Sequence, residues 1–139
     1  MNTSASLSRR RILQAGAATA ALAAPGLLLA QTRPIKVGLL HPVSGALAYS
    51  GGQSRLGGQM AIDEINAAGG IKSMGGAKLE ALLGDSQSRP EVGVSEVERM
   101  QQDGVAAYVG CFASAIALPA TQAAAKYNTP FLIDVGASD

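Results

Sequence analysis

The sequence predicts an α/β fold of three layers, in which helices cover both faces of a parallel sheet. Short apolar runs of strand length alternate with longer segments of helical periodicity. Most of the 17 glycines lie where one segment gives way to the next, as is usual at tight turns between strands and helices. The apolar runs also lack a clean alternation of apolar and polar residues, which is typical of strands buried on both faces.

The first half of the predicted domain has the order strand, helix, strand. Ile35–Leu40 (IKVGLL) is a short apolar run after Pro34, so we expect a buried strand there. We expect a long loop in HPVSGALAYSGGQ, followed by a helix in RLGGQMAIDEINAAGG that ends at Gly69 and Gly70. The second strand is expected at Lys78–Gly84.

The second half continues the alternation. Pro90 at the start and Gly104 at the end delimit a segment with an apolar stripe, which predicts a helix. A third strand is expected at Val105–Gly110, a helix in ALPATQAAAKYN, and a fourth strand at Pro130–Val135. The resulting order, βαβαβαβ, is typical of a parallel sheet with helical crossovers.

Residues 1–30 have the layout of a secretory signal of the twin-arginine type. Three arginines precede an apolar run that carries no charge until Arg33. The twin-arginine pattern is carried by Ser8, Arg9, Arg10, Ile12 and Leu13. We expect export to the periplasm by the twin-arginine machinery, with cleavage near Ala30. An uncleaved membrane anchor is the alternative, because the run is long enough to span a bilayer.

The composition excludes several classes of function. The formal net charge is +1, no basic block follows the N-terminus, and aromatic residues make up 4%, so nucleic acid is not an expected partner. A single cysteine forms no intrachain disulfide, and one cysteine with one histidine does not make a zinc site. We expect Cys111 to be a small buried hydrophobe, and we expect no cofactor.

Enzyme motifs are absent from the predicted loops. The connection after the first strand has no G-x-G-x-x-G spacing, no P-loop occurs, and the residues around Ser114 read CFASA rather than G-x-S-x-G. Asp85 and Asp134 are the acidic candidates near strand ends, and a turn or capping role is expected for Asp85. His41 either lines a cleft or is a polar turn residue.

Hydroxyl groups and bare backbone gather at the carboxyl edge of the predicted sheet, where open α/β sheets bind ligands. Helix N-termini at that edge present unpaired N–H groups, which suit a carboxylate. We therefore expect a small zwitterion or carboxylate to bind without reaction. Pro119 predicts a helix start between Ser114 and Leu118, so a helix cap is the alternative role for Ser114. The residues at this edge are Ser44, Tyr49, Ser50, Ser114, Gly136, Ala137 and Ser138.

Several stretches together resemble the periplasmic substrate-binding proteins of branched-chain amino acid ABC transporters. The resemblance runs from Ile35 to Asp139, and its most specific pieces are DEINAAGGI and the turn from Gly110 to Ser114. It implies a type I periplasmic binding protein, in which two Rossmann-like lobes joined by a hinge hold the ligand between them. The stretches are IKVGLLHPVSG, AIDEINAAGGI, KLEALLGDSQSRPEVGVSEVERM, VAAYVGCFASAIALPATQ and TPFLIDVGASD.

The resemblance also implies site residues. Ser114 matches a serine that contacts the ligand carboxylate, and Gly136 and Ser138 match positions that contact the ligand through backbone and hydroxyl. Ser50 stands where the family often has an aromatic residue over the ligand, which opens aliphatic amides, urea or aromatic acids as alternatives to leucine. The expected ligand-binding set is Ala113, Ser114, Gly136, Ser138, Ser50 and Tyr49.

On this basis residues 31–139 are expected to be an incomplete N-terminal ligand-binding lobe. The hinge and the second lobe would lie beyond Asp139. The expected function is that of the solute-binding component of an ABC importer, with a small amino-acid-like solute and an inner-membrane permease as partners. The alternatives are an exported α/β enzyme that ends before its catalytic residues and a ligand-sensing domain of an amide or amino-acid regulator.

Overall fold

The computed structural model describes residues 33–136, which form an α/β unit around a four-stranded, all-parallel sheet of order β2-β1-β3-β4. The predicted fold class and element order are confirmed. The predicted signal at residues 1–30 and the candidate residue Ser138 lie outside the described residues. The elements are β1 (Ile35–His41), α2 (Ala48–Ala67), η2 (Lys72–Met74), β2 (Leu79–Asp85), α3 (Pro90–Gln102), β3 (Ala107–Gly110), α4 (Ser114–Ala125) and β4 (Phe131–Ile133).

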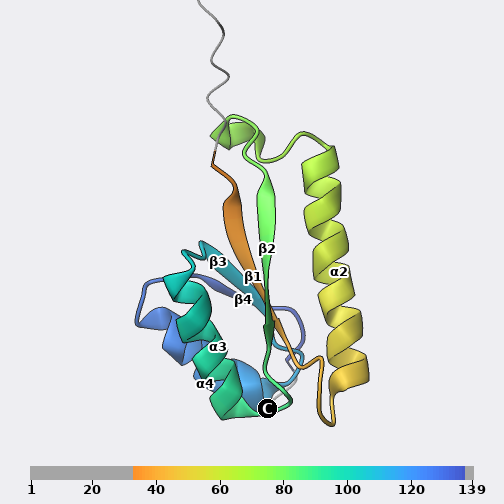
Figure 1. Ribbon diagram of the computed structural model, residues 1–139, viewed down its shortest axis with the longest axis vertical. Coiled ribbons are helices and arrows are strands. Elements are labelled where there is room, and N and C mark those ends of the chain that lie inside the picture. Colours follow the sequence, from red (N-terminus) through yellow and green to blue (C-terminus); the bar gives the residue numbers. More distant parts are fainter. Residues whose placement is uncertain (1–32, 137–139) are drawn as a thin grey trace, which may run out of the picture. The chain divides into compact units, whose positions relative to one another are not determined.

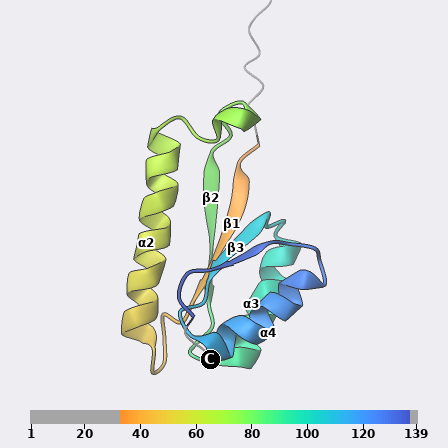
Figure 2. The same ribbon diagram turned by 180° about the vertical axis from the view of Figure 1, so that it is seen from behind.

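The helices cover both faces of the sheet, as expected. Helix α2 lies on one face, and α3 and α4 lie together on the other, in both the front and the back view (Figures 1 and 2). Helix α3 has Pro90 in its first turn, where the missing N–H leaves no hydrogen bond unmade, as the sequence predicts. Among residues 33–136, no helix combines the length and the apolar character needed to cross a membrane.

The expected loop at residues 41–53 is wrong in its second half, because α2 already begins at Ala48. The glycine pair in that stretch favours a loop by propensity, but packing decides otherwise. A Cβ atom on Gly51 would lie 2.1 Å from the carbonyl oxygen of Pro42, so only glycine lets the helix approach the end of β1 this closely. Strand β4 is shorter than expected and ends at Ile133.

The core lies between the sheet and the α3–α4 layer, and Tyr108 of β3 is its largest fully buried side chain. Its ring stacks on Phe131 of the neighbouring strand, with centroids 5.3 Å apart. The hydroxyl donates to the carbonyl oxygen of Val97 at 2.8 Å and contacts Gln101 Oε1 at 3.2 Å. Burial raises the pKa of Tyr108 to about 12, because the phenolate would lose its hydration there.

Cys111, which follows β3, is fully buried, as expected for a small hydrophobe. Burial raises the pKa of its thiol to about 12, and the negative charge of Asp134 contributes in the same direction. Since the thiolate is the nucleophilic form, this side chain is not an activated nucleophile in the folded chain.

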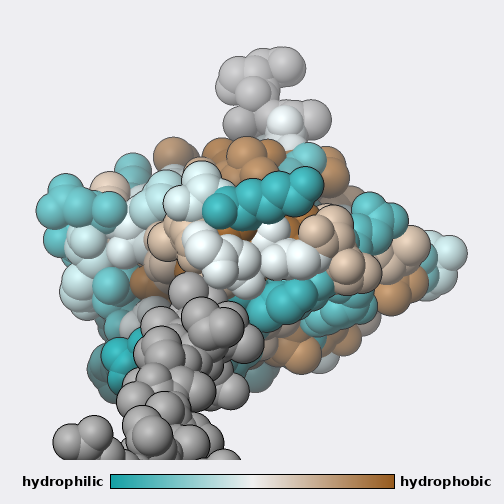
Figure 3. Space-filling view, turned by 90° about the horizontal axis from the view of Figure 1, so that it is seen from above, coloured by the Kyte–Doolittle hydropathy of each residue, from teal (hydrophilic) through white to brown (hydrophobic). Residues whose placement is uncertain are grey.

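Apolar side chains are also exposed. Seen from the edge at which the strands begin, apolar surface lies in several places among polar residues (Figure 3). On α2, Leu56 and Met60 are 54% and 55% exposed, and on β4, Leu132 is 66% exposed. These residues are not covered by any other part of the described chain.

Candidate functional site

The site is set by the point at which the strand order reverses. Strand β1 lies between β2 and β3, so the chain moves outward in one direction through α2 and in the other through α3 and α4. The segment after β1 leads to α2 on one face, and the segment after β3 leads to α4 on the other. Between these diverging segments an open parallel sheet has its crevice, at the carboxyl ends of the strands.

A tight turn after β3 forms one wall of this crevice. A Cβ atom on Gly110 would lie 2.0 Å from the carbonyl oxygen of Leu40, so only glycine lets the end of β3 approach β1 this closely. Phe112 has φ +70, a left-handed conformation that is rare for a bulky side chain. The turn thus combines two unusual backbone features directly before α4.

Ser114 is the first residue of α4, and Ala113 is the N-cap residue, with no side-chain capping bond. The alternative that Ser114 serves as the N-cap is therefore wrong. Pro119 lies inside the helix, beyond its first turn, contrary to expectation. The first turn is formed before the proline, by the Ala113 carbonyl, which accepts the N–H groups of Ile116 and Ala117.

The N-terminus of α4 presents unpaired donors. Within residues 33–136 the backbone N–H groups of Ser114 and Ala115 have no hydrogen-bond partner. The first N–H groups of a helix lack intrahelical acceptors, and the helix dipole places partial positive charge on them. This end of α4 can therefore accept a carboxylate or another anion.

A pocket of about 170 Å³ lies beside these donors. A Cβ atom on Gly136 would be 3.7 Å from Ser114 Oγ, so the two predicted residues lie next to each other. The pocket joins a polar end, formed by the serine and the backbone, to an apolar wall on α4 and β4. Its lining residues are Ser114, Ala117, Leu118, Thr121, Ile133 and Gly136.

The other predicted residues are placed differently. Tyr49 and Ser50 lie in the first turn of α2 rather than in a loop, and neither lines the pocket at Ser114. The Tyr49 side chain is 81% exposed. Ala113 joins the turn to α4, while Ala137 and Ser138 lie outside the described residues. The structure therefore brings Ser114 and Gly136 together. Tyr49 and Ser50 lie on α2, on the opposite side of the point at which the strand order reverses.

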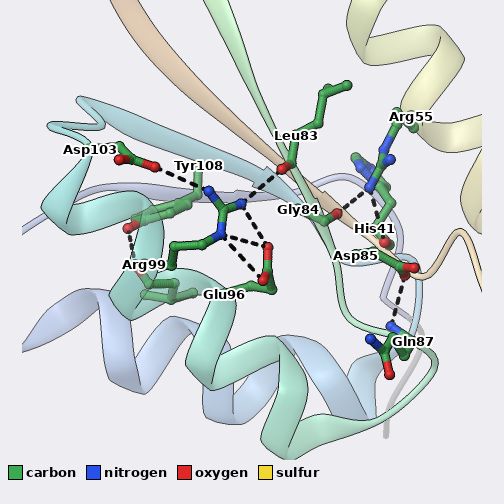
Figure 4. A network of polar contacts seen from close by, with 11 residues as sticks. His41, Arg55, Leu83, Gly84, Asp85, Gln87, Glu96, Arg99, Asp103 and Tyr108 are labelled. Carbon is green, nitrogen blue, oxygen red and sulfur yellow. Dashed lines mark hydrogen bonds and ion pairs between the residues drawn. The ribbon is translucent and has the colours of Figure 1, made fainter.

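Asp85, at the end of β2, has the turn role that the sequence predicts. Its Oδ1 accepts the N–H groups of Val43 at 3.0 Å and Gln87 at 2.8 Å, and its Oδ2 accepts the Ser44 hydroxyl at 2.6 Å (Figure 4 shows the bond to Gln87). The hydroxyl of Ser44 is thus committed to Asp85. Burial acts to raise the pKa of Asp85, but these hydrogen bonds outweigh it and hold the pKa below its ordinary value.

Asp85 therefore makes the fold sensitive to acid. Because its folded pKa is depressed, its contribution to stability is complete above the unfolded pKa, about 3.9, and is lost as the pH falls further through the folded pKa. We expect the difference in unfolding free energy between the wild type and Asp85→Asn to shrink below about pH 4. Urea titrations of both proteins from neutral to acid pH measure this. A difference that stays constant across that range would contradict the assignment.

Arg55 is a structural residue of the site that no sequence motif indicates. From α2 its Nη2 donates to the carbonyl oxygens of Gly84 and His41, the latter at 3.3 Å, and Figure 4 shows the side chain pointing to the ends of β1 and β2. Desolvation by burial lowers the pKa of Arg55, while Asp85 and Glu96 oppose that effect. The arginine fastens the first part of α2 to the carboxyl edge of the sheet.

A comparison with known protein families matches nearly all of the described chain. A family model described as "Periplasmic binding protein" matches residues 34–139. The chain belongs to the periplasmic binding protein family. This model, together with the relatives described below, confirms the resemblance to the branched-chain amino acid group. The α/β unit matches a lobe of a type I periplasmic binding protein.

Individual relatives agree with this assignment. The chain is 37% identical over 117 residues to the Leu/Ile/Val-binding protein homolog 1 of Brucella abortus, which is 84% of this chain and 30% of that protein. It is 39% identical over 87 residues to the leucine-, isoleucine-, valine-, threonine- and alanine-binding protein of Pseudomonas aeruginosa. That alignment covers 63% of this chain and 22% of the Pseudomonas protein. The chain thus spans about a third or less of the length of these periplasmic binding proteins.

A solved structure shows the same arrangement of elements. The branched-chain amino acid transporter substrate-binding protein LivJ of Streptococcus pneumoniae, determined in complex with isoleucine, aligns with a TM-score of 0.73 and 33% identity. The alignment covers 77% of this chain and 30% of that protein. The relatives named here are all described as binding proteins.

Proposed function

We propose that this chain is the ligand-binding part of the solute receptor of an ABC importer, and that it binds an amino acid or a similar small carboxylate or amide. We also propose that it works in the periplasm, reaches it through the signal at residues 1–30, and delivers its ligand to an inner-membrane permease. The family and its named relatives support this assignment. The observation that carries it is the apposition of Ser114 and Gly136 at one pocket.

The chemistry of the pocket favours a ligand with one anionic end and an apolar body. Ser114 lines the pocket and offers its hydroxyl and its N–H as donors, and the N–H of Ala115 follows it in the first turn of α4; within residues 33–136 neither N–H has a hydrogen-bond partner. A carboxylate accepts such donors more strongly than a neutral group does, because charge-assisted hydrogen bonds are shorter and stronger. Leu118 and Ile133 line the rest of the pocket, where an aliphatic side chain would bury its surface.

This part of the receptor alone is expected to bind weakly. A closed site buries most of its ligand, and the described residues form only one wall. If half of a binding free energy of about 8 kcal/mol is lost, the dissociation constant rises from the micromolar range to about 1 mM. The binding assay must therefore detect millimolar affinities.

Replacing Ser114 with alanine is expected to weaken binding about tenfold, because one donor to a buried carboxylate is lost. Saturation-transfer NMR with isoleucine, an aliphatic amide and an aromatic acid compares the wild type with Ser114→Ala. Ser95→Ala is the matched control, since Ser95 lies on the exposed side of α3 and bonds only to Glu91. If none of these compounds receives saturation, or if Ser114→Ala binds as well as the control, the proposed site is wrong.

A further inference from the structure

A hydrogen-bonded pair of side chains spans the carboxyl end of the sheet. His41, the last residue of β1, is fully buried, and its Nε2 lies 2.8 Å from Oδ2 of Asp134, directly after β4. Strand β3 lies between β1 and β4. The pair therefore crosses the end of β3, at the turn that leads to Ser114.

Asp134 also holds the two segments that flank the candidate pocket. Its Oδ1 accepts the N–H of Phe112 at 3.3 Å and that of Val135 at 2.8 Å. Phe112 lies two residues before Ser114, and Val135 directly precedes Gly136. One carboxylate thus connects the end of β1, the turn after β3 and the segment after β4.

The turn after β3 needs such support. Phe112 has φ +70, and a bulky residue keeps a sparsely populated conformation only where its surroundings enforce it. The bond from the Phe112 N–H to Asp134 acts at this residue. The bond therefore restrains the backbone two residues before Ser114.

His41 is an unusual residue for a fully buried position. His41 is fully buried, and within residues 33–136 its Nδ1 has no hydrogen-bond partner. A buried polar atom without a partner is unfavourable, but an apolar side chain in its place would leave Oδ2 of Asp134 without the His41 donor. The pair therefore contributes to stability, and its bonds to both segments beside the pocket allow it a role in geometry as well.

We propose that His41 and Asp134 are positioning residues that hold the turn after β3 and the segment after β4 so that Ser114 and Gly136 face one pocket. The inference rests on the proposed function for the significance of that pocket. The pair acts through backbone N–H groups and does not itself touch the ligand.

The charged and titratable groups around the pair come from several elements. Asp85 is the β2 register partner of His41, Arg55 of α2 donates to the His41 carbonyl, and Cys111 adjoins Asp134. Burial acts to raise the pKa of Asp134, but the bonds from His41 and Phe112 outweigh it and lower the pKa. At neutral pH Asp134 is therefore ionised, and the hydrogen between the two side chains belongs to His41 Nε2.

The first test needs no ligand. In NMR titrations of the whole chain toward acid pH, the amide proton signals of Phe112 and Val135 are expected to move with the same midpoint as the Asp134 carboxyl carbon. In Asp134→Asn this movement should vanish, while Asp103→Asn, which alters a surface carboxylate paired with Arg99, should keep it. Amide signals that do not follow Asp134 in the wild type would overturn the proposal even if the variants do not fold.

The second test uses isoleucine as the probe. His41→Leu fills the space but removes the donor, and His41→Gln keeps a donor. His41→Leu leaves the Asp134 carboxylate without this donor, so we expect a lower melting temperature and, at a temperature where the variant is folded, about tenfold weaker binding of isoleucine. We expect His41→Gln to recover most of both losses. Equal affinities of the wild type and His41→Leu would overturn the positioning role. If the wild type does not bind isoleucine, the proposed ligand class fails, and the amide titration still tests whether Asp134 holds the N–H groups of Phe112 and Val135.

Discussion

Gly51→Ala is expected to destabilise the chain by about 3 kcal/mol, the upper part of the range for overpacking in a well-packed interior. The added Cβ atom would lie 2.1 Å from the carbonyl oxygen of Pro42, and the obstacle is backbone rather than a flexible side chain. Either α2 or the segment after β1 has to move. Chemical denaturation followed by circular dichroism measures the loss.

The adjacent glycine provides the matched control. A Cβ atom on Gly52 would meet nothing within 4 Å, and the residue lies in the same helix. Gly52→Ala is therefore expected to stabilise the chain by about 0.5–1 kcal/mol, the advantage of alanine over glycine in a helix interior. Equal effects of the two substitutions would show that α2 does not pack on Pro42 as described.

Tyr108→Ala is expected to cost about 4 kcal/mol, because it empties the centre of the core and the stack on Phe131. Tyr108→Phe keeps the ring and removes only the hydroxyl, which leaves the Val97 carbonyl without that donor. We expect a loss of about 1–2 kcal/mol for this smaller change. Urea unfolding of both variants against the wild type gives the two values.

The order of the two losses is the critical result for Tyr108. If Tyr108→Phe were as harmful as Tyr108→Ala, the hydroxyl contacts rather than the ring would hold the layer of α3 and α4 on the sheet. If neither variant lost stability, Tyr108 would not be in the core. A rise of the tyrosinate absorbance near pH 10 from all tyrosines, without a component near the pKa of about 12 of Tyr108, would also contradict its burial.

The fold could be predicted from local sequence patterns because the apolar runs, the helical periodicity and the turn residues all indicate the same order of strands and helices. The apolar runs gave the four strands, and Pro90 marked the first turn of α3. The start of α2 could not be predicted, because the glycine pair at Gly51 and Gly52 favours a loop by propensity and the close packing of Gly51 on Pro42 is a contact with another segment. Pro119 was misleading because proline is most favourable in the first turn of a helix, whereas here it lies further inside α4.

The candidate site was predictable only in part. Ser114 and Gly136 follow different strands, and a parallel sheet brings their positions to one edge whatever the details of the loops. The pairing of His41 with Asp134 depends on the order β1-β3-β4 and on the register of these strands, which no local pattern contains. The same holds for Arg55, whose acceptors are carbonyl groups that exist at every residue.

The central claim is that a ligand carboxylate binds between Ser114 and Gly136. The most direct test is an NMR titration of the isotope-labelled chain with isoleucine, in which every backbone amide is followed. We expect the largest shifts at the amides of Ser114, Ala115 and Gly136, with a dissociation constant on the order of 1 mM. Saturable shifts confined to another part of the chain, or none at concentrations well above that value, would contradict the account.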